Sequence, residues 1–267
     1  MRTSLGALTA ALAIAGLAPA AADDLAAIRA RGTLRVVFGS YGMPEAISLA
    51  PGTPPGFERE MLEGFAALHR LKVEFVPVAT GGERIPALLA GKGDLVAGGL
   101  GVTAERRKVV DFTTEVFPSR HVAVTRRPHA PITTLAELRK VRVGSMKGSS
   151  WAETVVAAGV PKGNIDASFA TAEEVLQALR SGKVDAVVMA VGWALLEKRK
   201  DPEIELGLFL GDMTGRAWAV RKDTPQLLQA LDEYVSNMRH SPTWNRLVVK
   251  YYGELALEVL RKVRVSS

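Results

Sequence analysis

Strand-like and helix-like segments alternate along almost the whole of this chain, and that alternation limits the folds it can adopt. A β-rich run at 34–38 precedes a helical pattern in which Phe57, Met61 and Phe65 recur every four residues. Alternation of this kind predicts an α/β fold with parallel sheets rather than a β-sandwich. Further strands are expected at 73–78, 95–97, 121–125, 141–143, 185–189 and 217–220.

Helix starts are marked by residues that cap free backbone N–H groups. Thr134 with Glu137 and Thr171 with Glu174 both match a capping box. Near the end of the chain, Ser and Thr residues directly before Pro match an N-cap followed by Pro at the first helical position. These last pairs are Thr224-Pro225 and Ser241-Pro242.

The stretch at 98–112 carries the strongest sign of a binding site. Two Gly-rich turns follow a short buried strand, and Gly lets a ligand approach the main chain closely. Thr103 is the expected N-cap of a helical turn at 104–108, and Arg106 lies three residues after it. A guanidinium beside free backbone N–H groups suits a bidentate grip on a carboxylate. The alternative is a solvated basic turn at 106–108.

Residues 1–22 have the three parts of a secretory signal peptide. Arg2 supplies the charge, 5–17 is an apolar segment too short for a membrane span, and 18–22 offers small-residue cleavage sites. The alternative is an uncleaved anchor. The chain has no Cys, so neither a lipid-modified cysteine nor a disulfide is expected. We therefore expect a soluble, exported protein, most simply in a Gram-negative periplasm.

The net charge of +6 does not indicate nucleic-acid binding, because acidic and basic residues alternate and no basic stripe is interleaved with aromatic residues. The four His residues show no metal-ligand spacing, and no GxSxG, HExxH or phosphate-loop motif occurs. No cofactor, metal site or catalytic residue is expected. Small anionic ligands fit the charge better, and a monomer is expected.

The order of motifs resembles the extracellular solute-binding proteins of the amino-acid type, family 3. The likeness covers nearly the whole chain after residue 22, and although each motif is weak alone, their order is specific. It rests on 32–36, 56–61, 85–88, 91–94, 103–106 with 111–112, 143–150, 181–188 and the Lys-Tyr-Tyr-Gly run at 250–253.

The resemblance implies a type II periplasmic-binding-protein fold, with two α/β lobes, two crossover strands between them and a ligand cleft. Lobe 1 would comprise 23–122 plus the tail 218–267, and lobe 2 would comprise 127–213. The crossovers would fall near 121–126 and 215–219.

The same resemblance implies site residues on both lobes. Arg106 would bind the ligand carboxylate beside Gly99, Gly101 and Thr103, with Tyr41 as an aromatic wall. On lobe 2, Ser149 and Ser150 match a hydroxyl pair at a helix start, where N–H groups and the helix dipole favour an anion, and Lys147 adds positive charge. The alternatives are that these serines only cap the helix and that Tyr41 belongs to the core.

Two positions depart from the family pattern. Ala190 stands where amino-acid binders usually place an Asp for the ligand ammonium, and Gly81 stands where many have an aromatic residue. An ammonium buried without a carboxylate partner costs several kcal/mol. The ligand is therefore expected to be an anion without an obligatory α-amino group, unless Glu58 or Glu153 replaces the missing Asp.

Three functions follow from the resemblance. The first is a periplasmic binding protein for an ABC importer, by similarity an amino-acid transport component. The second is a sensory or accessory binding protein for amino acids or wall fragments. The third is an enzyme like the periplasmic dehydratases of the family, with Glu153 as a candidate acid. The chain is also similar to the non-catalytic module of membrane-bound lytic transglycosylases.

Overall fold

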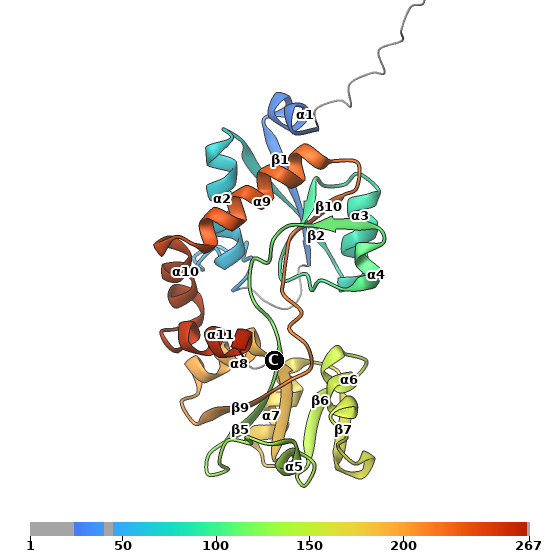
Figure 1. Ribbon diagram of the computed structural model, residues 1–267, viewed down its shortest axis with the longest axis vertical. Helices are drawn as coiled ribbons and strands as arrows, with labels where there is room; N and C mark the ends of the chain where they lie inside the picture. The colour runs from blue at the N-terminus through green and yellow to red at the C-terminus, as the bar shows by residue number, and fades with distance from the viewer. Residues whose placement is uncertain (1–23, 40–44, 266–267) are drawn as a thin grey trace, which may run out of the picture.

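The computed structural model describes residues 24–39 and 45–265, and within them two five-stranded sheets form the frame of the protein. The first sheet has the strand order β2-β1-β3-β10-β4, and the second has the order β7-β6-β8-β5-β9. Figure 1 shows them as two lobes, one above the other. We call the parts built on these sheets the first and second lobes. The expected two-lobed α/β fold is confirmed.

The first lobe holds both early and late parts of the chain. Its elements are α1 (Asp24–Arg31), β1 (Thr33–Gly39), α2 (Phe57–Leu68), β2 (Lys72–Val78), the 3-10 turn Gly81–Glu83, α3 (Arg84–Leu89), β3 (Leu95–Val96), α4 (Ala104–Arg107), β4 (Val110–Phe112), β10 (Ala219–Arg221), α9 (Pro225–Arg239), α10 (Pro242–Tyr252) and α11 (Leu255–Val265).

The second lobe is continuous in sequence. Its elements are β5 (His121–Arg126), α5 (Leu135–Leu138), β6 (Val143–Met146), α6 (Ser150–Ala157), the 3-10 turn Lys162–Asn164, β7 (Ile165–Phe169), α7 (Ala172–Arg180), β8 (Ala186–Ala190), α8 (Val191–Lys200) and β9 (Ile204–Leu210). The sequence reading did not identify β7, α8 or β9 here, nor β4 and α11 in the first lobe.

The expectation of purely parallel sheets was wrong. β10 runs antiparallel to β3 and β4, and β5 runs antiparallel to β8 and β9. Both β5 and β10 come directly after the chain passes from one lobe to the other. A strand that enters a sheet from the other lobe has no preceding crossover helix in that sheet, so the right-handed βαβ rule does not set its direction.

The chain passes between the lobes at 113–120 and at 211–218 (Figure 1). The first passage lies before the crossover that was predicted near 121–126, because every residue of His121–Arg126 pairs with a strand of the second sheet. Arg216 joins the two passages, forming antiparallel bridges with Gly101 and with Phe117. The exact lobe limits predicted from sequence stay a prediction.

Helix α8 follows strand β8 of the second sheet in the sequence, but it also packs against the first lobe. Its residues Val191, Leu195 and Leu196 share one buried apolar cluster with α2, α9, α10 and α11. At its far end, the Arg199 guanidinium donates hydrogen bonds of 3.0 Å to the carbonyl oxygens of Lys250 and Tyr251. These carbonyls lie at the C-terminal end of α10, where helical acceptors lack partners. α8 therefore connects the lobes alongside the two passages.

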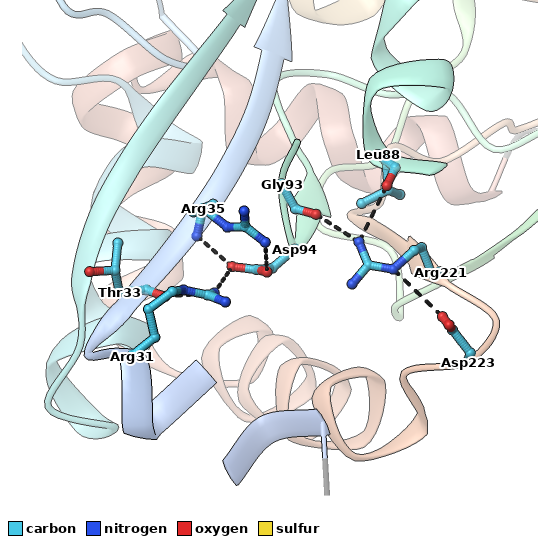
Figure 2. Close-up of polar contacts among 8 residues, drawn as sticks. All are labelled: Arg31, Thr33, Arg35, Leu88, Gly93, Asp94, Arg221 and Asp223. Carbon is cyan, nitrogen blue, oxygen red and sulfur yellow. Dashed lines mark hydrogen bonds and ion pairs between the residues drawn. The ribbon is translucent and has the colours of Figure 1, made fainter. Parts of the chain in front are cut away.

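An Asp before a central strand plays the same structural part in each lobe. Asp94 accepts the Arg35 N–H at 2.8 Å and also binds the guanidinium groups of Arg31 and Arg35 (Figure 2). Asp185 accepts the Arg142 N–H at 2.9 Å and binds its guanidinium. Figure 2 also shows Arg221 donating to the carbonyl oxygens of Leu88 and Gly93. The two Gly-Lys-Xaa-Asp motifs therefore fasten loops to strands.

Most helix starts follow the sequence signals. Thr134 forms the full capping box with Glu137. Thr171 accepts from the Glu174 N–H, but the Glu174 carboxylate accepts from Ala170 rather than from Thr171. Thr224 makes no side-chain cap. The predicted signal peptide lies outside the described residues. Within the described ranges, every helix is too short or too polar to cross a bilayer.

Candidate ligand site between the lobes

A cavity of about 530 Å³ is bounded by residues of both lobes. This volume lies within the usual range for small-molecule sites. The first lobe contributes the end of β1, the start of α3 and the turn at Gly98 and Gly99, and the passage at 211–218 contributes Arg216. The second lobe contributes the end of β6, the starts of α6 and α7, and one side of α8 along its length. The lining residues are Gly39, Arg84, Gly98, Gly99, Met146, Trp151, Ala170, Thr171, Ala172, Glu173, Trp193, Glu197, Lys200 and Arg216.

A buried carboxylate binds the backbone of the turn at Gly98 and Gly99. Glu58, which is 4% exposed, accepts the Gly98 N–H at 2.8 Å and the Gly99 N–H at 2.7 Å. It also accepts the Trp218 indole N–H at 3.0 Å. Both glycines have positive φ, 82° and 74°, which explains the need for Gly. The expectation that these two N–H groups are free for a ligand was therefore wrong.

Arg106 lies beside Gly101, as the sequence pattern suggested. Thr103 caps the turn by accepting the Arg106 N–H at 3.2 Å, and the Arg106 guanidinium donates to the Gly101 carbonyl oxygen at 2.6 Å. The side chain is partly exposed. Gly101, Thr103 and Arg106 thus form one unit two residues after Gly99, which lines the cavity.

Two further arginines lie in the cavity wall and were not identified from the sequence. Arg84 is 9% exposed and donates to the Gly98 carbonyl oxygen at 3.1 Å. Arg216 is 8% exposed and lies at the junction of the two passages. Arg216 falls inside the crossover predicted at 215–219, which was the one available signal for it. Both guanidinium groups are cationic hydrogen-bond donors.

The second-lobe turn before α6 uses its two serines differently. Ser149 is the N-cap: its hydroxyl donates to the Met146 carbonyl oxygen at 2.6 Å and accepts the Ala152 N–H at 3.4 Å. The capping alternative is therefore confirmed for Ser149. The Ser150 hydroxyl instead lies 3.4 Å from Nε2 of His121. Lys147 is exposed on the same turn. None of these three residues is part of the cavity lining.

His121 joins this turn to the first passage between the lobes. Its Nδ1 lies 2.7 Å from the Thr154 hydroxyl on α6. Burial, with a smaller contribution from the positive charge of Arg216, lowers the pKa of His121 to about 4. The imidazole is therefore neutral near pH 7. The sequence analysis found no metal-ligand spacing for His121 or the other His residues, and nothing in the local sequence of His121 indicates its place between the lobes.

The remaining predicted residues have mixed outcomes. Ala190 ends β8 and is 6% exposed, paired in register with His121. Neither proposed replacement for the missing Asp faces the cavity as an unpaired carboxylate: Glu58 is engaged as described, and Glu153 is exposed on α6 outside the lining. Tyr41 lies outside the described residues. The structure thus places Gly99 in the lining, whereas the other described candidates lie outside it, on neighbouring turns or, for Ala190, at the end of β8.

The second-lobe wall is mainly apolar, with two carboxylates engaged in ion pairs. Arg180 binds Glu173 at 2.9 Å and Glu197 at 2.7 Å, and Lys200 lies 3.1 Å from Glu197. Glu197 is only 2% exposed. The two cations therefore balance both acids. Over the part of the chain that the structure covers, no group of three or more His, Cys, Asp or Glu could hold a metal ion.

The sequence pattern of the bacterial extracellular solute-binding proteins, family 3, matches residues 34–254. The chain belongs to this family. A relative of this family-3 protein, the membrane-bound lytic murein transglycosylase F of Maricaulis maris, is 30% identical over 200 residues. These residues are 74% of this chain but only 44% of that protein. Amino-acid-binding protein AabA of Dichelobacter nodosus is 26% identical over 79% of this chain and 84% of its own.

The structure of the family-3 chain is similar to solved structures of amino-acid-binding proteins. An ancestral cationic amino-acid solute-binding protein matches with a TM-score of 0.76 and 27% identity, covering 85% of this chain and 99% of that one. An ancestral arginine-binding protein bound to arginine matches at 0.64 and 31%, with 84% and 99% covered. The unliganded, open L-cystine receptor of Neisseria gonorrhoeae matches at 0.69 and 20%, over 86% and 97%, which supports the fold alone.

Proposed function

We propose that this family-3 chain is a periplasmic solute-binding protein that captures a small carboxylate-bearing ligand between its lobes for an ABC importer. The observation that carries the proposal is the cavity of about 530 Å³ with walls from both lobes. A ligand held there contacts both lobes at once. Contacts of this kind stabilise a closed arrangement over an open one.

The charge of the first-lobe side supports an anionic group in the ligand. Arg84 and Arg216 line the cavity, and Arg106 lies on the adjoining turn. We assign the carboxylate of the ligand to this side, with Arg106 as its principal partner. Ser150 is the second-lobe hydroxyl proposed to meet the same ligand, because the Ser149 hydroxyl is engaged in its cap. Closure of the lobes would place Arg106 and Ser150 in contact with the same ligand.

We propose the lobe limits predicted from the sequence, 23–122 plus 218–267 in one lobe and 127–213 in the other, except that His121 and Val122 pair within the second sheet. Export through cleavage of residues 1–22 and a monomeric state are also part of the proposal. N-terminal sequencing of the protein from periplasmic extract should start near Ala21 or Asp23. An intact Met1 in that fraction would contradict the cleaved signal.

A second function is binding without transport, as a sensor or accessory protein for amino acids or wall fragments. The observation in its favour is the relative named lytic transglycosylase F, of which this chain spans 44%. An enzymatic role is not proposed, because the candidate acid Glu153 lies on the exposed side of α6, outside the cavity lining.

Capture is tested by mass spectrometry of small molecules released from the mature protein, followed by calorimetry with the compounds found. A true ligand at a hundred times its Kd should stabilise the fold by about 2.7 kcal/mol, and small-angle scattering should show compaction as the lobes close. If nothing co-purifies, and neither amino acids nor organic acids change the melting temperature or the radius of gyration, the proposal fails. Import, as opposed to sensing, is tested by pull-down of importer membrane subunits.

A further inference from the structure

A second cavity, of about 400 Å³, lies among the helices α9, α10 and α11, which follow one another along one side of the first lobe (Figure 1). Its lining holds three arginines, Arg239 at the end of α9 and Arg261 and Arg264 on α11, together with Asn245 on α10. The rest of the lining is apolar and consists of Trp244, Leu257 and Leu260. The two cavities share no lining residue, so the second one is a separate candidate site.

Two of these arginines converge on one carboxylate. Arg239 and Arg264 lie 3.3 Å and 3.2 Å from the same oxygen of Glu115, on the first passage between the lobes. Arg239 is the more enclosed, with 18% of its side chain exposed against 43% for Arg264. Burial lowers the pKa of Arg239, the charge of Glu115 raises it, and the charge of Arg264 lowers it. One carboxylate thus serves two guanidinium groups that repel each other.

Arg261 brings a third positive charge to the lining. Among the described residues its guanidinium donates to the Leu257 carbonyl oxygen of its own helix, at 3.2 Å, and forms no ion pair. The carboxylate of Glu258 acts on Arg261 through its charge at longer range and is itself paired with Lys262 at 2.7 Å. The three arginines therefore exceed the one carboxylate that they bind, Glu115, by two positive charges.

From this arrangement we infer that the second cavity binds the phosphate group of a free phosphate ion or of a small phosphate ester. A phosphate group carries a charge of about −1.5 to −2 near pH 7 and has three strong acceptor oxygens, so it matches the charge excess and the three guanidinium groups. A carboxylate has one charge and two oxygens. Planar guanidinium groups are well suited to bind phosphate oxygens in pairs. The inference goes beyond the proposed function, because this site lies outside the interlobe cavity.

Arg261 is the residue whose replacement tests the site most directly. Arg239 and Arg264 fasten the first passage to α9 and α11 through Glu115, so removing either would disturb the passage as well as the cavity. Replacing Arg261 leaves those contacts in place. Arg246 on α10 is the matched control, because it is exposed and lies outside the lining.

Calorimetry with inorganic phosphate, glycerol 3-phosphate and acetate tests the ligand class, at one ionic strength set with sodium chloride. We expect both phosphates to bind, and acetate to bind at this site at least about tenfold more weakly. Sedimentation with phosphatidic acid vesicles tests the source of the phosphate group. Binding to vesicles without binding to either soluble phosphate would overturn the inference, since the ligand would then be a membrane headgroup.

Variants separate a ligand contact from general surface charge. Arg261→Gln should weaken phosphate binding at least about tenfold, because a hydrogen bond between charged groups is lost. Arg261→Lys keeps the charge but loses the planar fork, so its affinity should lie between the two. Arg246→Gln should stay within about twofold of the wild type. Thermal unfolding reports whether each variant is folded, and if Arg261→Gln melts early, Arg261→Lys supplies the comparison.

Three further results overturn the inference. One is the absence of binding by either soluble phosphate at millimolar concentration. Another is an unchanged phosphate affinity in a folded Arg261→Gln protein, which would place the bound phosphate elsewhere. The last is acetate that binds as tightly as phosphate and is lost in the same variant. None of these results bears on capture of a carboxylate in the interlobe cavity, which is measured with other ligands and other variants.

Discussion

The carboxylate of Glu58 on α2 accepts the indole N–H of Trp218 at 3.0 Å, although the two residues are 160 positions apart. Trp218 lies at the end of the second passage between the lobes. The same carboxylate holds the turn at Gly98 and Gly99. One buried acid therefore ties the cavity turn to the passage, and the shape of the cavity depends on it.

Glu58→Gln should lower the free energy of unfolding by about 2 kcal/mol, because an amide group would direct its own donors at backbone or indole N–H donors. Urea denaturation measures the change. Glu63→Gln on the same helix is the control, since Glu63 is 42% exposed and forms only a surface pair with Arg59; it should change stability by less than about 0.5 kcal/mol. If the two variants lower the free energy of unfolding equally, the buried hydrogen bonds of Glu58 stabilise the protein no more than the surface pair of Glu63 does.

Arg106→Ala should weaken binding of the carboxylate ligand by about 3 kcal/mol, roughly a hundredfold, as when one partner of an enclosed charge pair is removed. Arg107→Ala is the matched control, because Arg107 is the next residue of α4 and is exposed. Calorimetry on both variants distinguishes a ligand contact from general surface charge. An affinity within about twofold of the wild type would mean that Arg106 only supports the Gly101 turn.

His121 should titrate near pH 4 in the ligand-free protein, since burial and Arg216 lower its pKa from 6.5 to about 4. Between these values the unfolded chain binds a proton that the folded chain does not. Stability from this group is therefore complete above pH 6.5 and is lost as pH falls through 4. NMR of the imidazole protons measures the titration, and His121→Gln should remove this part of the pH dependence. A midpoint near 6.5 would contradict the buried, neutral imidazole.

Asp185→Asn should destabilise the second lobe at pH 7 by about 1–2 kcal/mol, because the carboxylate binds both the backbone and the guanidinium of Arg142. The hydrogen bonds from Arg142 lower the pKa of Asp185 below its ordinary value of 3.8. The wild-type advantage should therefore be complete above about pH 4 and disappear as pH falls through the lower, folded-state pKa.

Thermal unfolding at pH 7 and at pH 2 measures this difference. Asp223→Asn is the control, since Asp223 is 81% exposed and 3.6 Å from Arg221; it should have little effect at either pH. A destabilisation by Asp185→Asn that is the same at both pH values would show that the charge is not responsible.

The sequence alone determined the α/β fold class, most of the strands and the caps that start the helices, because these features depend on local patterns: apolar periodicity, Thr and Ser at helix starts, and Gly where φ is positive. The two lobes were expected only from the resemblance of the motif order to family 3. The turn with Gly101, Thr103 and Arg106 was predicted for the same reason, because its capping and its arginine contact span only five residues.

Tertiary structure decided the cavity walls, because they come from segments far apart in the chain. No local signal pairs Glu58 with Trp218, places Arg84 and Arg216 in one lining, or sets Trp151 against Trp193. Those contacts depend on how the chain returns between lobes and on which strands become antiparallel. The sequence thus indicated which turns could bind an anion, whereas packing decided that the N–H groups of Gly98 and Gly99 are already occupied by Glu58.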